Sequence, residues 1–111
     1  MSFFESDIVI NDLNEIEDLQ KQAYQNAYKF SFMDRDEKLE HIDLLRSLIE
    51  KQKLLYVRLS LSEDPEAKHL QKRIEDSVVM MGMSEDGSDI YAAFDAMTAT
   101  VDSLKEDMDR A

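Results

Sequence analysis

Apolar residues recur every three or four positions through the last quarter of the chain. This spacing places them on one face of an α-helix and is typical of the a/d seam of packed helices. We therefore predict a helix over residues 89–109 that lies against other helices. Its seam consists of Ile90, Phe94, Met97, Val101, Leu104 and Met108.

Two longer stretches with the same period precede it. The first is predicted to be helical over residues 7–32, ending at about Phe30 or Phe32, after the capping-box spacing of Ser2 and Glu5 and an N-cap at Ser6 or Asp7. The second is predicted over residues 35–61, with Asp34 as its N-cap. The first seam is Val9, Leu13, Ile16, Gln20, Ala23, Ala27 and Phe30.

The stretch over residues 35–61 carries an unusually wide apolar arc, which predicts that it is covered on two sides and lies centrally. Only two or three residues join it to the stretch before it, so the two should form an antiparallel hairpin, with residue i near residue 66−i. One stripe is Ile42, Leu45, Ile49, Gln52, Tyr56 and Leu59, and a second is Leu44, Leu48 and Leu55.

The clearest break in the chain falls at Asp64 and Pro65. Asp is a favoured N-cap, and Pro suits the first helical position because that position needs no N–H donor. A third helix is predicted over residues 65–81, with Leu70, Ile74, Val78 and Met81 facing inward. Gly82 is predicted to be a left-handed C-cap, followed by a loop over residues 84–87 and a cap at Ser88 or Asp89.

These elements predict an all-α protein with one helical domain over residues 1–111: a long antiparallel hairpin plus two shorter helices. The third helix is shorter than either arm of the hairpin, so one chain should cover only part of it. We therefore expect the bundle to be completed by a second copy, as a dimer, or by another protein.

Composition narrows the functional classes. Cysteine is absent, which excludes disulfides, thiolate metal sites and cysteine catalysis. No 18-residue apolar run and no secretory signal pattern occur, so we expect a cytoplasmic protein without a membrane partner. The net charge of −12 repels nucleic acid and favours a partner with a basic surface.

No motif in the sequence supplies catalytic, cofactor or metal chemistry. Glu66 and His69 have the Glu-x-x-His spacing of di-iron bundles, but His41 lacks such a glutamate, so the second unit is missing. The acidic loop over residues 84–89 lacks the register of a calcium-binding loop. We expect no catalytic residues, no cofactor and no metal.

Three groups of residues are candidates for binding a partner, each with a simpler structural interpretation. Phe3 and Phe4 either anchor a partner or fold onto the bundle, and Tyr24 and Tyr28 form either a docking patch or the edge of the core. An acidic line on the last helix is either a solvated face or a site for a basic partner. That line is Asp95, Asp102, Glu106 and Asp109. Gln20 and Gln52, polar at seam positions, are expected at the rim or fixing helix register.

Four short segments resemble a small family of unknown function, DUF1825, found chiefly in cyanobacteria. They are FFESDIV at 3–9, LSEDPEA at 61–67, MGMS at 81–84 and FDAM at 94–97. The resemblance implies a bacterial cytoplasm, or a virus of such bacteria, but no activity and no site residues.

The function that the sequence favours is a non-enzymatic protein–protein interaction module, as a small adaptor or regulatory subunit. The alternative is an acidic inhibitor that mimics nucleic acid and occupies a basic site on a DNA- or RNA-binding protein. A metal-dependent bundle enzyme, resting on Glu66 and His69 alone, is the remote third.

Overall fold

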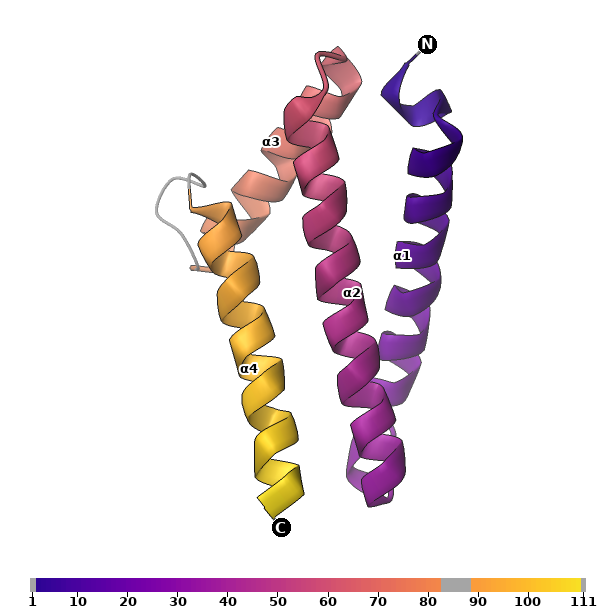
Figure 1. Ribbon diagram of the computed structural model, residues 1–111, viewed down its shortest axis with the longest axis vertical. Coiled ribbons are helices and arrows are strands. Elements are labelled where there is room, and N and C mark those ends of the chain that lie inside the picture. The colour runs from indigo at the N-terminus through magenta and orange to yellow at the C-terminus, as the bar shows by residue number, and fades with distance from the viewer. Residues whose placement is uncertain (1, 83–88, 111) are drawn as a thin grey trace.

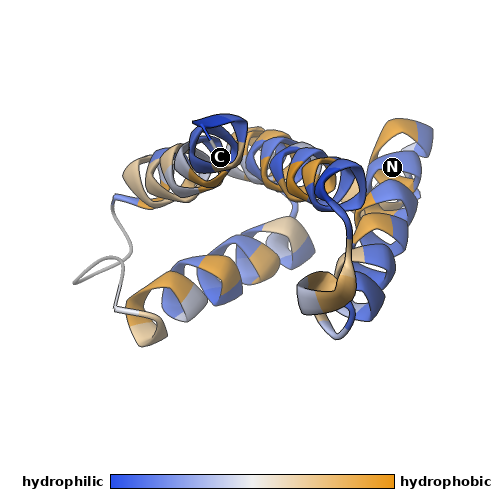
Figure 2. Cartoon of the chain, turned by 90° about the horizontal axis from the view of Figure 1, so that it is seen from below, coloured by the Kyte–Doolittle hydropathy of each residue, from blue (hydrophilic) through white to orange (hydrophobic). Residues whose placement is uncertain are grey.

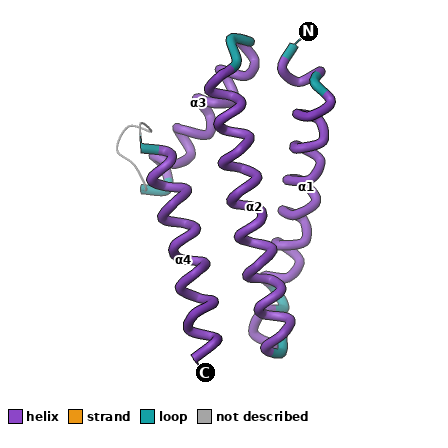
Figure 3. The backbone as a smooth tube through the Cα atoms, viewed as in Figure 1, coloured by secondary structure: helices purple, strands orange, loops and turns teal. Residues whose placement is uncertain are grey.

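The computed structural model describes residues 2–82 and 89–110, and every regular element in these ranges is helical. Four α-helices lie in these ranges, and Figures 1 and 3 show how they are arranged. They are α1 (Asp7–Ala27), α2 (Arg35–Leu61), α3 (Pro65–Met80) and α4 (Ile90–Arg110), with short 3₁₀ turns η1 (Phe3–Glu5) and η2 (Phe30–Phe32). The predicted all-α fold is confirmed.

Helix α2 lies in the middle, with α1 along one side and α4 along the other (Figure 1). The molecule is flat, with extents of 49 × 32 × 19 Å. Helix α3 crosses one face obliquely from the end of α2 toward the start of α4, and Figure 2 shows it on one side of the α2–α4 pair. Because α3 has 16 residues and α2 has 27, it covers only part of that face.

The predicted starts of α2 and α3 rest on the expected capping carboxylates, whereas Ser6, the N-cap of α1, makes no side-chain capping hydrogen bond. The carboxylate of Asp34 accepts the N–H of Glu37 at 2.8 Å, and the carboxylate of Asp64 accepts the N–H of Glu66 at 2.9 Å. Pro65 opens α3, and Gly82 after it has a φ of 74°, which is the left-handed conformation that glycine favours. The predicted loop at 84–87 and the cap at Ser88 lie outside the described residues.

The first helix ends earlier than its periodicity predicts. The α-helix stops at Ala27, and the chain continues through η2, where the N–H groups of Lys29 and Phe32 donate to carbonyls three residues earlier. This tighter turn brings the ring of Phe30 to 5.5 Å from that of His41 on α2.

Two predicted seam positions outside α1, Met81 and Leu104, are more exposed than expected. Met81, the C-cap of α3, is 61% exposed, and Leu104 on α4 is 46% exposed because α3 does not reach that far along α4. Gln20 on α1 is also exposed. These positions all lie on the side of the molecule that α3 leaves partly open.

Two hydrophobic clusters hold the helices to α2. The larger joins α2 to α4 and the end of α3, and the smaller joins α2 to α1, the start of α3 and the aromatic pair near the N-terminus. The larger contains Ile42, Ile49, Tyr56, Val78, Ile90, Ala93, Phe94 and Val101, and the smaller contains Ile16, Leu55, Leu59 and Ala67. The predicted central position of residues 35–61 is therefore confirmed.

Candidate docking surface

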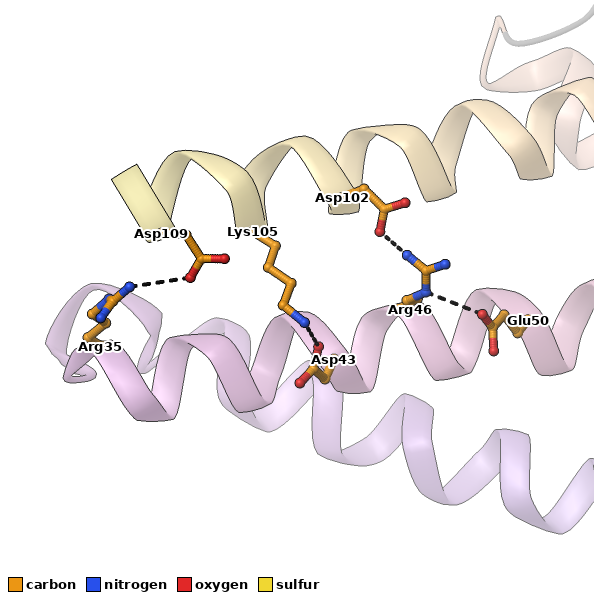
Figure 4. A network of polar contacts seen from close by, with 7 residues as sticks. All are labelled: Arg35, Asp43, Arg46, Glu50, Asp102, Lys105 and Asp109. Atoms are coloured by element: carbon orange, nitrogen blue, oxygen red, sulfur yellow. Dashed lines mark hydrogen bonds and ion pairs between the residues drawn. The ribbon is translucent and has the colours of Figure 1, made fainter. Parts of the chain in front are cut away.

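The acidic line predicted on the last helix faces basic residues of α2 within the same chain. Asp95 pairs with Lys53 at 3.0 Å and Asp109 with Arg35 at 3.3 Å, while Asp102 pairs with Arg46. Figure 4 shows the pairs at Arg35 and Arg46, together with the reversed pair in which Lys105 contacts Asp43 at 3.2 Å. The remaining member of the line, Glu106, lies 3.8 Å from Arg110 on its own helix.

The contacts of Asp95, Asp102 and Lys105 share one antiparallel register of α2 and α4. A step of seven residues from Arg46 to Lys53 on α2 matches the step of seven from Asp102 back to Asp95 on α4. The carboxylate of Asp102 raises the pKa of Arg46, first through its hydrogen bond and then through its charge. Three of the four acidic residues therefore pair with α2 within the chain, and a role of the line in binding a partner stays a prediction. The matching seven-residue spacings were the signal in the sequence that could have revealed this pairing.

The two N-terminal aromatic residues fold onto the bundle. Phe3 and Phe4 are half-buried, meet edge to face with their ring centres 5.1 Å apart, and pack against the smaller hydrophobic cluster. The N–H of Phe3 also donates to the carboxylate of Asp64 at 2.7 Å. This packing is the simpler of the two interpretations given above, and a role in partner binding stays a prediction.

Tyr24 and Tyr28 lie on the outer surface of α1. Their side chains are 69% and 73% exposed, and their ring centres are 5.6 Å apart. The hydroxyl of Tyr28 donates to that of Tyr24 at 3.3 Å, and this hydrogen bond raises the pKa of Tyr28. Tyr24 lines a shallow surface hollow that also includes Glu17 and Gln20.

A groove lies beside α3. It has a volume of about 560 Å³, with α1 and α3 as walls and α2 and α4 as its floor. It is lined by Leu13, Ile16, Glu17, Gln20, Gln52, Leu55, Leu70, Ile74, Ser77, Val78, Met81, Phe94 and Met97.

A second hollow of about 490 Å³ adjoins it along α2 and α4, beyond the reach of α3. The two share Gln52 and Met97, so they form one continuous surface, which we call the open face. Among its described lining residues, Glu17 is the single charged one. The second hollow is lined by Leu45, Leu48, Ile49, Gln52, Ala96, Met97, Thr100, Val101 and Leu104.

Two residues of the open face stood out in the sequence, although the surface itself could not be predicted from it. Gln20 and Gln52 are polar at seam positions, and both line it. Their polarity is explained by the partial exposure of this face, since a polar residue in a helix seam is tolerated where water or a partner reaches it.

Comparison with known proteins identifies the family of the chain. The model of the Domain of unknown function (DUF1825) matches residues 1–108. The chain belongs to the DUF1825 family. No curated protein and no solved structure matches it.

The histidines of this DUF1825 chain occupy different environments. His69 on α3 is exposed, whereas His41 on α2 is only 7% exposed, and its Nδ1 atom has no hydrogen-bond partner among the described residues. Burial lowers the pKa of His41. Over residues 2–82 and 89–110, no group of three or more His, Cys, Asp or Glu side chains is arranged to hold a metal ion.

A partly buried ion pair joins α1 to α2 in this DUF1825 chain. Asp12 contacts Arg58, and one turn further along α1 Glu15 contacts Lys51. The hydrogen bond from Lys51 lowers the pKa of Glu15. The second pair agrees with the predicted register of the hairpin.

No helix in the described part of the chain has the length and apolar character needed to cross a membrane.

Proposed function

We propose that this chain is a non-enzymatic protein–protein interaction module of the cytoplasm, acting as a small adaptor or regulatory subunit, and that the open face is its docking surface. The observation that carries the proposal is the continuous, largely apolar lining shared by the two hollows along α2 and α4. A protein chain is the occupant that fits such a surface, because its apolar side chains complete the packing that α3 provides only in part.

The charge distribution supports the open face over the acidic line as the docking surface. A mimic of nucleic acid needs carboxylates that are free to meet a basic partner. Asp95, Asp102 and Asp109 instead meet Lys53, Arg46 and Arg35 within the chain. At longer range the net charge of −12 repels acidic proteins, so any partner other than a second copy should carry a basic surface.

Affinity capture with paired variants tests the proposal. The full chain is immobilised and exposed to an extract of its source organism, alongside Leu104→Lys and Leu61→Lys. Leu104 lines the open face, while Leu61 is 79% exposed at the end of α2 and lies outside that lining, so both changes place a lysine at an accessible leucine.

We expect a stoichiometric protein partner to bind the wild type and Leu61→Lys but not Leu104→Lys. Circular dichroism checks that both variants keep the helical content of the wild type. Equal capture by the two variants, or no stoichiometric partner at all, would contradict the proposed docking surface.

A further inference from the structure

We propose that the occupant of the open face is a second copy of this chain, in a two-fold symmetric dimer whose axis passes beside Gln52. The inference rests on the proposed function, since it names the protein that docks on the same surface. Three independent features support it: the surface area of the chain, the distribution of its charge and the position of Gln52.

The chain exposes more surface than a monomer of its size. Folded monomers follow a scaling of surface with mass that gives about 6,300 Å² for this chain. The structure exposes 7562 Å² for a mass of 12.9 kDa. The surplus is about 1,250 Å², while each partner in a standard interface buries about 800 Å². This excess belongs to the surface of the whole chain, and it is larger than the area that one partner buries in such an interface.

The shape of the molecule agrees with its area. Its radius of gyration is 15.7 Å, whereas a compact domain of this length has a value of about 13 Å. The difference arises because α1, α2 and α4 lie side by side and α3 covers only part of one face (Figures 1 and 2). A second copy laid on the open face would give a more compact particle.

Charge restricts where two copies can meet. Each chain carries a net charge of −12, so contacts between most surfaces would bring like charges together. The described lining of the open face carries one charged side chain, Glu17, which belongs to α1 at the wall of the groove. The floor on α2 and α4 is uncharged, so two copies can approach there without repulsion between like charges.

Gln52 occupies the place that a two-fold axis requires. It is one of the two residues shared by both hollows and therefore lies centrally on the open face. A primary amide both donates and accepts hydrogen bonds, so it is complementary to its own copy across a two-fold axis. The Gln52 side chain is partly exposed, and no hydrogen bond to it is found among the described residues.

Sedimentation equilibrium of the full chain with a charge-exchange pair tests the inference. We expect the wild type to have twice the mass of 12.9 kDa. Gln52→Glu and Gln52→Lys should each weaken the dimer at least about a hundredfold, because like charges would face one another across the axis. An equimolar mixture of the two variants should restore the dimer, because opposite charges then meet.

Two further variants serve as controls. Gln22→Glu and Gln22→Lys make the same changes at an exposed glutamine of α1 outside the described lining, and they should leave the dimer intact. Thr100→Arg, at an exposed position on the same face, should also dissociate the dimer, which keeps the test valid if Gln52 variants fold poorly.

The inference is overturned by a wild type that stays monomeric at all concentrations, by a dimer that survives both Gln52 variants, or by a mixture that does not reassociate. A monomeric wild type that still captures another protein in a Leu104-dependent way refutes the dimer and leaves the proposed function standing. A monomer without such capture refutes both.

Discussion

Asp64 joins two distant parts of the chain through one carboxylate. It caps α3 by accepting the N–H of Glu66, and it holds the N-terminal turn by accepting the N–H of Phe3. These two hydrogen bonds, the one from Phe3 first, lower the pKa of Asp64. The capping role could be predicted from the sequence Asp64-Pro65, whereas the contact with Phe3 depends on where the folded chain returns.

We expect Asp64→Ala to lower the free energy of unfolding near neutral pH, with a smaller loss for Asp64→Asn, because Asn keeps a capping oxygen. The folded pKa lies below the unfolded value of about 3.9, so the stabilisation is present above that value and disappears as the pH falls through the folded pKa. Urea denaturation between neutral and acid pH measures it, with Glu63→Ala as the control. An equal loss at every pH would contradict the role of the charge.

His41 should make stability sensitive to mild acid. Burial lowers its pKa in the folded chain, so its neutral form is favoured there and the unfolded chain binds the proton more readily. Stability is therefore full above the unfolded pKa of about 6.5 and falls as the pH drops below it, until the folded pKa is reached. We expect His41→Phe to remove this dependence in thermal unfolding, and His69→Gln to retain it.

At the scale of elements, α4 packs on α2 through its apolar seam, and matched charges lie beside that seam. The seam of α4 was evident from its spacing and is confirmed by the burial of Ile90, Phe94 and Val101. Spacing does not show what covers that face, and the wide apolar arc of residues 35–61 left two candidates, that stretch of the same chain first and that of a second copy next. The ion pairs with α2 supply that information, since they fix both the neighbour and its direction.

Reversing one of these pairs should test the register directly. Asp95→Lys and Lys53→Glu should each lower the free energy of unfolding, and the double variant should recover part of the loss. We expect a coupling of about 0.2–1 kcal/mol, the usual range for exposed pairs, since the side chains are 69% and 41% exposed. A double-mutant cycle in urea measures this coupling. If the losses of unfolding free energy are simply additive, the two side chains do not interact.

Element boundaries were predictable where a cap or a proline sets them, and less so elsewhere. The start of α2 at Arg35 and of α3 at Pro65 follow from Asp34 and Asp64. The end of α1 at Ala27 does not follow from periodicity, because the 3₁₀ turn after it continues the apolar pattern through Phe30. The boundary coincides with the packing of Phe30 on His41, a tertiary contact that periodicity does not reveal.

For the whole molecule, one buried residue connects three helices. Leu59 on α2 is fully buried in the smaller cluster, with Ile16 of α1 and Ala67 of α3. We expect Leu59→Ala to lower the free energy of unfolding by about 2–5 kcal/mol, because it opens a cavity that the helices cannot close. Leu61→Ala, at a position 79% exposed, should change it little. Urea denaturation followed by circular dichroism distinguishes the two.

The sequence predicted a surplus of apolar surface but not its form. The shorter third helix indicated that part of the hairpin would stay uncovered, and α3 with 16 residues agrees. The open face itself depends on the angle at which α3 crosses α2 and α4, and no local pattern in the chain encodes that angle. Gln20 and Gln52, which are polar at seam positions, were the two signs of the open face in the sequence.

The central position of α2 has a consequence for how the molecule opens. Helices α1 and α4 pack on opposite sides of α2, so either one can detach while the other stays in place (Figure 1). Native-state hydrogen exchange should then show separate openings, with the amide protons in the middle of α2 exchanging slowest, because they are released only when the whole chain unfolds. A single exchange free energy shared by all of the helices would show instead that the chain opens as one unit.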